Sequence, residues 1–155
     1  MKTYNKLKVY LLICCILIAL ISCEKDDAKA TSELRYFRFS GCPEENHGNW
    51  QDTSFVAATT NKDVIKKCLE QLKLPVNERS LFPLGKLASG SAGYNKNNTH
   101  SFSWHLIEDD WDMVEVGIEI YDGCPYSDAE LSDYLNTVER YGGWGNRVVE
   151  ELDIE

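Results

Sequence analysis

The sequence predicts a single α+β domain in which an antiparallel sheet of about five strands is covered on one face by two helices. Three observations predict this fold. Short segments rich in aromatic and β-branched residues recur along residues 34–152, as they do in antiparallel strands. Two other segments carry apolar residues at helical spacing. The 155 residues, 43% of them hydrophobic and 26% charged, match the size and balance of one globular domain.

The first three elements are two strands and a helix. Residues 34–39 (LRYFRF) and 54–59 (SFVAAT) are strand-like, with a polar loop between them. We expect a helix to begin at Thr60, whose hydroxyl can cap it, with Asp63 at the positive end of the helix dipole. Pro75 ends this helix. Its apolar side consists of Val64, Ile65, Cys68, Leu69 and Leu72.

A third strand is expected over residues 82–88, where Pro83 favours a position at the edge of the sheet. The polar stretch that follows, residues 90–99 (GSAGYNKNNT), has the composition of a flexible loop.

Residues 101–121 predict a β-hairpin. Residues 101–107 and 113–121 both alternate, and the five residues between them are a usual length for a hairpin loop. If Ile107 pairs with Met113, His105 lies opposite Glu115. One face is then wholly apolar and must be buried, and it contains Phe102, Trp104, Leu106, Val114, Val116, Ile118 and Ile120. The other face contains Ser101, Ser103, His105, Glu115, Gly117, Glu119 and Tyr121.

A second helix and a short strand complete the expected domain. Ser127 and Glu130 form a capping box that opens the helix, and Gly142 and Gly143 end it. Residues 147–149 can supply a last strand. The inner side of this second helix consists of Leu131, Tyr134, Leu135 and Val138. The expected order of elements is β-β-α-β-β-β-α-(β).

The first 22 residues predict export. A basic segment precedes residues 9–21, which are almost purely apolar but too few to cross a bilayer as a helix, since this takes ~20 residues. The end of this segment, Leu20-Ile21-Ser22-Cys23, resembles the lipobox of bacterial lipoproteins, in which the cysteine is acylated and becomes the first mature residue. The alternative is an ordinary signal peptide that contains Cys23. We therefore divide the chain into a signal peptide (1–22), a lipidated cysteine with a flexible tether (23–33) and one domain (34–152).

Acyl chains on Cys23 would anchor the protein to membrane lipid, in the outer membrane of a bacterium. Residues 24–27 (EKDD) resemble a surface-export signal and are equally a solvated tether, so the side of the membrane stays open. Without Lys2, Lys6 and Lys8 the 16 Lys and Arg side chains fall to 13 against 25 acids, which gives residues 23–155 a net charge of −12. Such a surface repels phosphate backbones, and this argues against nucleic acid as a partner.

Three further cysteines lie in the expected domain. Cys68 falls on the apolar side of the first helix and is expected to pack as a small hydrophobe. Cys42 and Cys124 each precede a proline in a turn, and export permits a disulfide between them. The cysteine spacings match no zinc site, and no nucleotide-binding motif is present. We expect neither a metal nor a cofactor.

Four segments together resemble a small exported domain of bacterial proteins, which is related to the N-terminal module of a calmodulin-binding protein. They are Tyr36-Phe37-Arg38-Phe39, Ser103-Trp104-His105-Leu106, Glu115-x-x-x-Glu119-x-x-Asp122-Gly123-x-Pro125 and Trp144-Gly145-Asn146-Arg147-Val148-Val149. The resemblance spans residues 34–152. It implies a fold more than an activity, and it brings no catalytic residues with it.

The chain departs from that domain at two positions. Relatives have cysteine where Tyr121 stands, and another just before the late tryptophan, where this chain has Gly142-Gly143. We therefore expect no bridge between those segments. Calmodulin itself is not expected as a partner, because it is foreign to a bacterial lipoprotein and no basic amphipathic helix is evident as its target.

His105 with Glu115 and Glu119 is the best candidate for chemistry, and Ser103 shares their face. An imidazole and carboxylates could hold a divalent ion or act in acid–base catalysis. The alternative is a solvated cross-strand pair of little energetic weight.

The predicted hairpin turn is crowded with acids, namely Glu108, Asp109, Asp110 and Asp112. Such a turn offers oxygen ligands to calcium, although the EF-hand pattern fails, or it is a solvated tip. Trp111 in the same turn either folds back onto the sheet or is exposed for a partner. Trp104 and Trp144 are expected to pack inside the domain. Trp50 and Trp111 are therefore the two tryptophans that could stack against a glycan.

The resulting hypothesis is a lipid-anchored interaction or binding module of the cell envelope without catalytic activity, whose ligand is an unidentified protein or glycan. One alternative is a small hydrolase or metal-dependent enzyme that uses His105, Glu115 and Glu119. Another is an inhibitor or immunity-type lipoprotein that acts through residues 90–99 or the turn around Trp111.

Overall fold

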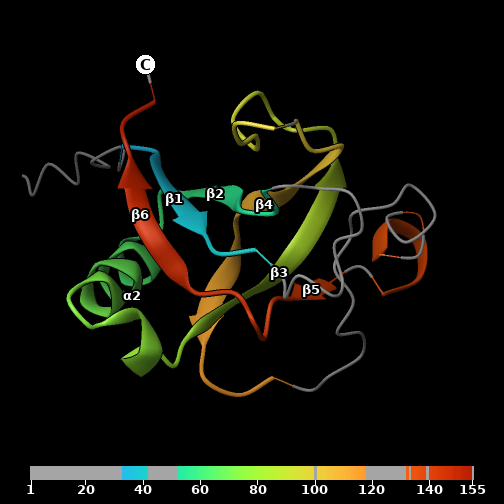
Figure 1. Ribbon diagram of the computed structural model, residues 1–155. Coiled ribbons are helices and arrows are strands. Elements are labelled where there is room, and N and C mark those ends of the chain that lie inside the picture. The colour runs from blue at the N-terminus through green and yellow to red at the C-terminus, as the bar shows by residue number, and fades with distance from the viewer. Residues whose placement is uncertain are drawn as a thin grey trace, which may run out of the picture. The chain divides into compact units, whose positions relative to one another are not determined.

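The computed structural model describes most of the chain between Glu33 and Ile154. All of these residues belong to one compact unit, Thr31–Glu155. They form two three-stranded antiparallel sheets and one α-helix, which lies beside the first sheet (Figure 1). The described residues are 33–41, 52–99, 101–117, 132, 134–138 and 140–154.

The first sheet has β1 (Arg35–Phe39) at its centre, between β2 (Phe55–Thr59) and β6 (Val148–Leu152). Both pairings are antiparallel. Because side chains alternate along a strand, Phe37 and Phe39 point to the same face of β1, and both are fully buried there. This face forms one wall of the core.

The second sheet has β3 (Phe82–Ser89) at its centre, between β4 (Trp104–Val114) and β5 (Arg140–Gly142). The edge position expected for β3 from Pro83 is therefore wrong. Pairing with β5 begins one residue after Pro83, whose carbonyl accepts a hydrogen bond from the N–H of Gly143 at 2.9 Å. The proline's missing N–H thus falls just outside the β5 ladder, where it interrupts no pairing.

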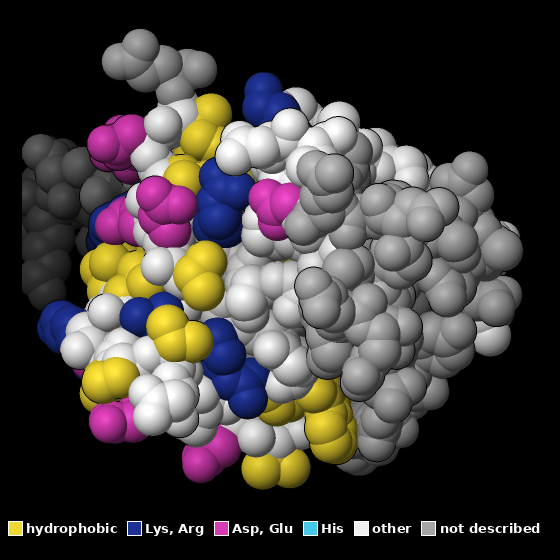
Figure 2. All heavy atoms as spheres, in the orientation of Figure 1, with side chains coloured by type: hydrophobic (Ala, Val, Ile, Leu, Met, Phe, Trp, Pro, Cys, Tyr) yellow, Lys and Arg dark blue, Asp and Glu magenta, His cyan; other side chains and the backbone are white. Residues whose placement is uncertain are grey.

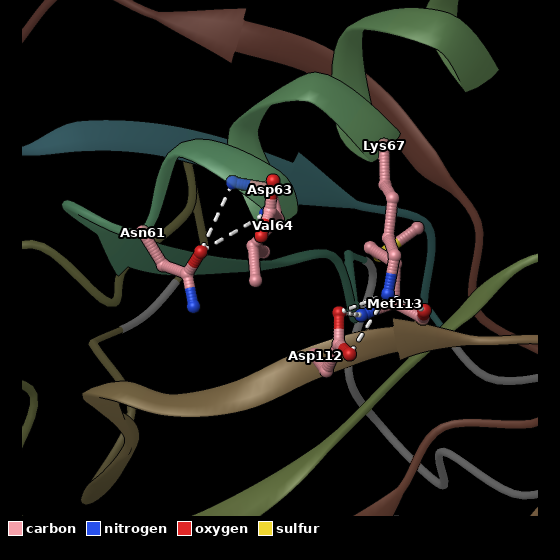
Figure 3. A network of polar contacts seen from close by, with 6 residues as sticks. All are labelled: Asn61, Asp63, Val64, Lys67, Asp112 and Met113. Carbon is pink, nitrogen blue, oxygen red and sulfur yellow. Dashed lines mark hydrogen bonds and ion pairs between the residues drawn. The ribbon is translucent and has the colours of Figure 1, made fainter.

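The helix α2 (Lys62–Leu72) follows β2 after a short turn. Asn61 caps it, because its Oδ1 accepts hydrogen bonds from the backbone N–H groups of Asp63 at 3.0 Å and Val64 at 3.4 Å (Figure 3). The cap expected at Thr60 is therefore one residue too early. A 3₁₀ turn, Val76–Glu78, follows the helix after the predicted stop at the proline.

Lys67 connects α2 to β4. Its Nζ lies 2.7 and 2.8 Å from the two carboxylate oxygens of Asp112 and 3.2 Å from the carbonyl oxygen of Met113 (Figure 3). Both side chains of the ion pair are more than a third exposed. Water screens such a pair, which contributes about 1 kcal/mol or less.

The larger of two buried clusters among the described residues fills the space between the two sheets and α2. Its aromatic rings contact one another at centroid distances from 5.3 to 5.9 Å. Truncation of one such buried ring to alanine costs about 3–5 kcal/mol, so this cluster is the main source of stability. The rings in contact are Phe39, Phe55, Phe102, Trp104, Trp111 and Tyr141.

The hairpin predicted over residues 101–121 is wrong in the part of it that the structure describes. One continuous strand, β4, runs through the supposed turn. Its register against β3 shifts, because Gly85 pairs with Trp111 and Leu87 pairs with Leu106. This bulge changes the phase of the strand, so Leu106 and Trp111 both face the core although they are five positions apart, which in a regular strand would put them on opposite faces. The sequence shows the same phase change, which we interpreted as a turn between two strands.

The predicted fold class is also wrong, because it placed one sheet of five strands under two helices. The described residues form six strands in two sheets and one α-helix, so the domain is mostly β. The strands over residues 34–39, 54–59 and 82–88 and the first helix are confirmed at nearly the predicted bounds. The last strand is confirmed as β6.

The predicted second helix lies largely outside the described residues. Its described part includes one π-helical turn, Tyr134–Val138, and β5 then begins at Arg140, where the helix was expected to continue. Within the described ranges no helix is long and apolar enough to span a bilayer.

Candidate functional site

His105 and Glu115 do not meet. His105 lies near the start of β4, opposite Ala88 of β3, and its Nδ1 is 2.6 Å from the carbonyl oxygen of Gly90. Glu115 is exposed and follows the last residue of β4. Their neighbours on β3, Ala88 opposite His105 and Phe82 opposite Val114, are six residues apart, so at ~3.3 Å per residue the two side chains are separated by about 20 Å.

The rest of the predicted catalytic face is not assembled either. Ser103 is exposed and directly precedes β4, and its carbonyl accepts a hydrogen bond from the N–H of Gly90 at 2.7 Å. In the part of the chain that the structure describes, no three His, Cys, Asp or Glu side chains are grouped to hold a metal ion. The remaining candidates lie outside the described residues, namely Cys23, Cys42, Trp50, Glu119 and Cys124.

The acidic residues of the supposed turn each have a partner in the fold. Glu108 accepts a hydrogen bond from the hydroxyl of Tyr94 at 3.0 Å. Asp110 lies 4.0 Å from Arg140. Asp112 binds Lys67, as described above. These carboxylates therefore diverge toward three different elements, which is the opposite of a calcium loop, where the oxygens converge.

Asp109 joins the bulge of β4 to the turn between β2 and α2. Its φ of 63° is in the left-handed region, which Asp tolerates better than most residues. The carboxylate accepts four hydrogen bonds, from Thr59 Oγ1 at 2.8 Å, Thr60 N and Oγ1 at 2.7 Å each, and Asn61 N at 3.1 Å. These donors, the Thr60 hydroxyl first, lower the pKa of Asp109 below its usual value.

Trp111 is folded into the core. It is 4% exposed, its ring meets Phe39 edge-on at 5.8 Å, and its Nε1 donates to the carbonyl oxygen of Ala58 at 2.8 Å. It is therefore no contact residue for a partner.

Cys68 is a buried free thiol on the inner face of α2, and burial raises its pKa above the usual range. This agrees with its expected packing role.

Side chains cover the outer edge of β2. The amide of fully buried Asn95 accepts from Val56 N at 2.9 Å and donates to Trp104 O at 2.7 Å. The amide of Asn97 donates to Ser54 O at 2.9 Å. Together with the indole of Trp111, these amides take the place of a neighbouring strand. The two sheets meet along this edge.

The segment 90–99 is consequently held in place against the first sheet, although its composition predicted a flexible loop. Gly90 and Gly93 adopt positive φ values of 82° and 80°, which allow the chain to turn back. The ring of Tyr94 then packs edge-on against Tyr36 of β1 at 5.5 Å. Burial and then Glu108 raise the pKa of Tyr94, so its hydroxyl remains a donor.

This packing leaves a groove on the outer face of the first sheet, between the segment 90–99 and the C-terminal end of β6. We call it the outer groove. Its volume is about 400 Å³. Figure 2 shows basic, acidic and apolar side chains side by side on the face that carries β1 and β6. The groove is lined by Arg38, Val56, Tyr94, Lys96, Asn97, Asn98, Leu152, Asp153 and Ile154.

The outer groove combines an apolar floor with a polar rim. Tyr94 belongs to a small buried cluster on this face, against which Leu152 packs. The guanidinium of Arg38 is held by Glu150 at 3.3 Å, while exposed Lys96 has no ion-pair partner among the described residues. Pockets that bind small ligands are commonly of this size and have this division between apolar surface and a few polar groups.

A family model described as the BP-74 N-terminal domain matches residues 33–155. The chain belongs to this family. The match covers every described residue of the fold, and it confirms the relation to the N-terminal module of a calmodulin-binding protein. Comparison with curated proteins gave no match, and comparison with solved structures gave none.

Sequence reasoning missed the outer groove of this BP-74 N-terminal domain. It treated residues 90–99 as solvated because six of the ten are Gly, Ser or Asn. The signal that could have found the groove is Tyr94, the one aromatic residue in that polar stretch. A lone aromatic residue flanked by glycine and asparagine is better explained by a segment packed on a sheet.

Proposed function

We propose that this chain is a lipid-anchored binding module of the bacterial cell envelope, without catalytic activity, and that its BP-74 N-terminal domain takes its ligand in the outer groove. The observation that carries the proposal is the character of that groove. It presents Arg38 and Lys96 beside an apolar floor, on a chain whose residues 23–155 have a net charge of −12. Arg38 is already paired with Glu150, so Lys96 is the cation left for a ligand, and its position next to apolar surface favours ligands that have both an anionic or hydroxyl-rich part and an apolar part.

A protein segment or a glycan of the envelope has this chemistry. Asn98 and Asp153 add an amide and a carboxylate to the rim, which suit hydroxyl groups as well as backbone groups. Anchoring through Cys23, in the outer membrane, is supported by the lipobox-like segment Leu20-Ile21-Ser22-Cys23. The proposal favours a binding module over an enzyme because His105 and Glu115, two residues of the candidate catalytic face, lie at opposite ends of β4.

The test is a titration of ¹⁵N-labelled protein with envelope glycan fragments and with peptides from envelope proteins, followed by amide resonances. We expect one class of ligand to shift Lys96, Asn98 and Ile154 together. Lys96→Glu should weaken that binding about tenfold or more, since it replaces an attraction by a repulsion. Lys86→Glu on β3 has the same charge change away from the groove and is the matched control.

Binding that shifts resonances elsewhere, or that Lys86→Glu weakens as much as Lys96→Glu, would contradict the proposal. Turnover of a substrate that disappears in His105→Ala would instead favour an enzyme.

A further inference from the structure

A second groove lies between α2 and the start of β1, and its lining is mainly basic. Its volume is about 570 Å³. Of the 13 Lys and Arg side chains in residues 23–155, four gather here. The lining consists of four cations (Arg35, Lys62, Lys66, Lys73), two carboxylates (Glu33, Glu70) and two apolar side chains (Ile65, Leu69). We call this surface the α2 basic face.

Helical geometry explains why the lysines share one face. Lys62, Lys66 and Lys73 are separated by four and seven residues, which places them in one stripe along α2, with Leu69 between the last two. All three lysines are exposed. Arg35 is paired with Glu151 and Lys66 lies 3.9 Å from Glu70, whereas Lys62 and Lys73 have no ion-pair partner within the described ranges.

Two apolar side chains just beyond the C-terminal end of the helix are exposed as well. Leu74 and Val76, which follow α2, are 37% and 55% exposed. The expectation that the chain has no basic amphipathic helix is thus corrected by α2, which has exposed lysines on one side and a buried apolar side. Exposed lysines together with exposed aliphatic side chains have the composition of a surface that lies on anionic lipid, where the cations meet headgroups and the aliphatic groups enter the interface. An acidic protein partner would explain the lysines but not their position in the chain.

That position is set by the tether. Glu33, the first described residue, lines the α2 basic face. Cys23 is ten positions before it, and a fully extended chain of that length reaches at most about 35 Å. The tether therefore joins the domain at the edge of this face, and an acyl group on Cys23 would keep that point within about 35 Å of the bilayer.

We propose that the α2 basic face lies against the anionic phospholipid headgroups of the membrane to which the chain is anchored, and that this contact orients the domain. The inference rests on the proposed anchoring. With the α2 basic face turned to lipid, the domain has a fixed rather than a random orientation on its tether.

The first experiment uses the full acylated chain in lipid nanodiscs, with acetylation of each lysine followed by mass spectrometry. In nanodiscs with phosphatidylglycerol we expect Lys62, Lys66 and Lys73 to react several-fold more slowly than in nanodiscs of phosphatidylcholine alone. Lys86 and Lys96 should react equally in both, and they serve as internal controls. Equal rates for the α2 lysines in both discs overturn the inference, and so does protection that requires an added envelope protein.

A second experiment does not depend on acylation. The unit of residues 31–155 contains its whole core and is expected to fold alone, so it can be sedimented with vesicles of equal parts phosphatidylglycerol and phosphatidylcholine at low salt. Replacement of Lys62, Lys66 and Lys73 by Gln should weaken sedimentation about fivefold per lysine. The matched control replaces Lys86, Lys96 and Arg140 by Gln and should have little effect.

Equal losses in the two triple variants overturn the inference, because they would reflect net charge alone. The intact mass of the nanodisc sample separates the two proposals. An acylated chain with unprotected α2 lysines contradicts the orientation and leaves the anchoring intact, whereas a chain without acyl groups contradicts the anchoring.

Discussion

Asp109 accepts two hydrogen bonds from Thr60, one from its backbone N–H and one from its hydroxyl, both at 2.7 Å. The contact joins residues that are 49 positions apart and fixes the point where β2 ends and α2 is about to begin. It also explains why a run of acids inside β4 does not form a turn.

Asp109→Ala should lower the free energy of unfolding by about 2–3 kcal/mol, because it removes a capping carboxylate and puts alanine at a left-handed φ. Asp109→Asn should cost less, since Asn tolerates that φ and keeps one acceptor oxygen. Asp110→Ala is the matched control and should cost about 0.5 kcal/mol or less, given its 4.0 Å contact with Arg140. Urea unfolding measures all three, and equal losses for the two alanine variants would disprove this role.

Low pH should remove the contribution of the Asp109 carboxylate to the free energy of unfolding. Hydrogen bonds from the Thr60 hydroxyl and its neighbours hold the pKa of Asp109 below the ordinary value of 3.8. A lowered pKa in the folded state stabilises the protein above that ordinary value, and the stabilisation is lost as the pH falls through the folded-state pKa. We therefore expect the stability difference between wild type and Asp109→Asn to be constant near neutral pH and to shrink below pH 3.8. Urea unfolding across that range is the measurement, and a difference independent of pH would contradict the assignment.

Asn95→Ala should destabilise the domain by about 2–4 kcal/mol, because it leaves the buried N–H of Val56 and the carbonyl of Trp104 without partners. The variant should also speed hydrogen exchange at Val56. Asn98→Ala, an exposed amide in the same segment, should change stability by about 0.5 kcal/mol or less. If Asn95→Ala proved as mild as Asn98→Ala, the side chains would not be what closes the edge of β2.

Two substitutions of Trp111 separate its ring from its N–H group. Trp111→Ala should cost about 3–5 kcal/mol through the cavity it leaves. Trp111→Phe keeps most of the ring but loses the hydrogen bond to Ala58, and should cost about 1–3 kcal/mol. Thermal and urea unfolding give both values. A Trp111→Ala variant as stable as wild type would mean that the ring is not part of the core.

The sequence was sufficient for elements whose pattern is local. Phe37 and Phe39 alternate within one strand, and the apolar stripe of α2 repeats at helical spacing, so each could be predicted without knowledge of its neighbours. The break in alternation between Leu106 and Trp111 was ambiguous, since a bulge and a hairpin both change the phase. Only the pairing of β4 with β3 decides between them. The predicted His105–Glu115 site depended on that hairpin, so it was wrong as well.

The outer groove could not be predicted from local patterns, because its walls come from distant segments. Val56, Tyr94 and Leu152 belong to three parts of the chain that meet only after both sheets have formed. The decisive contacts are side chain to backbone, as with Asn95 and Val56, and no periodicity in a sequence reports them.

Both proposals depend on the anchoring of the chain at Cys23, and the intact mass of the protein purified from its native membrane tests this most directly. The account predicts a mature chain that begins at Cys23 and carries the added mass of acyl chains on that residue. A chain that retains residues 1–22, or a soluble chain whose Cys23 is an unmodified thiol, would contradict it.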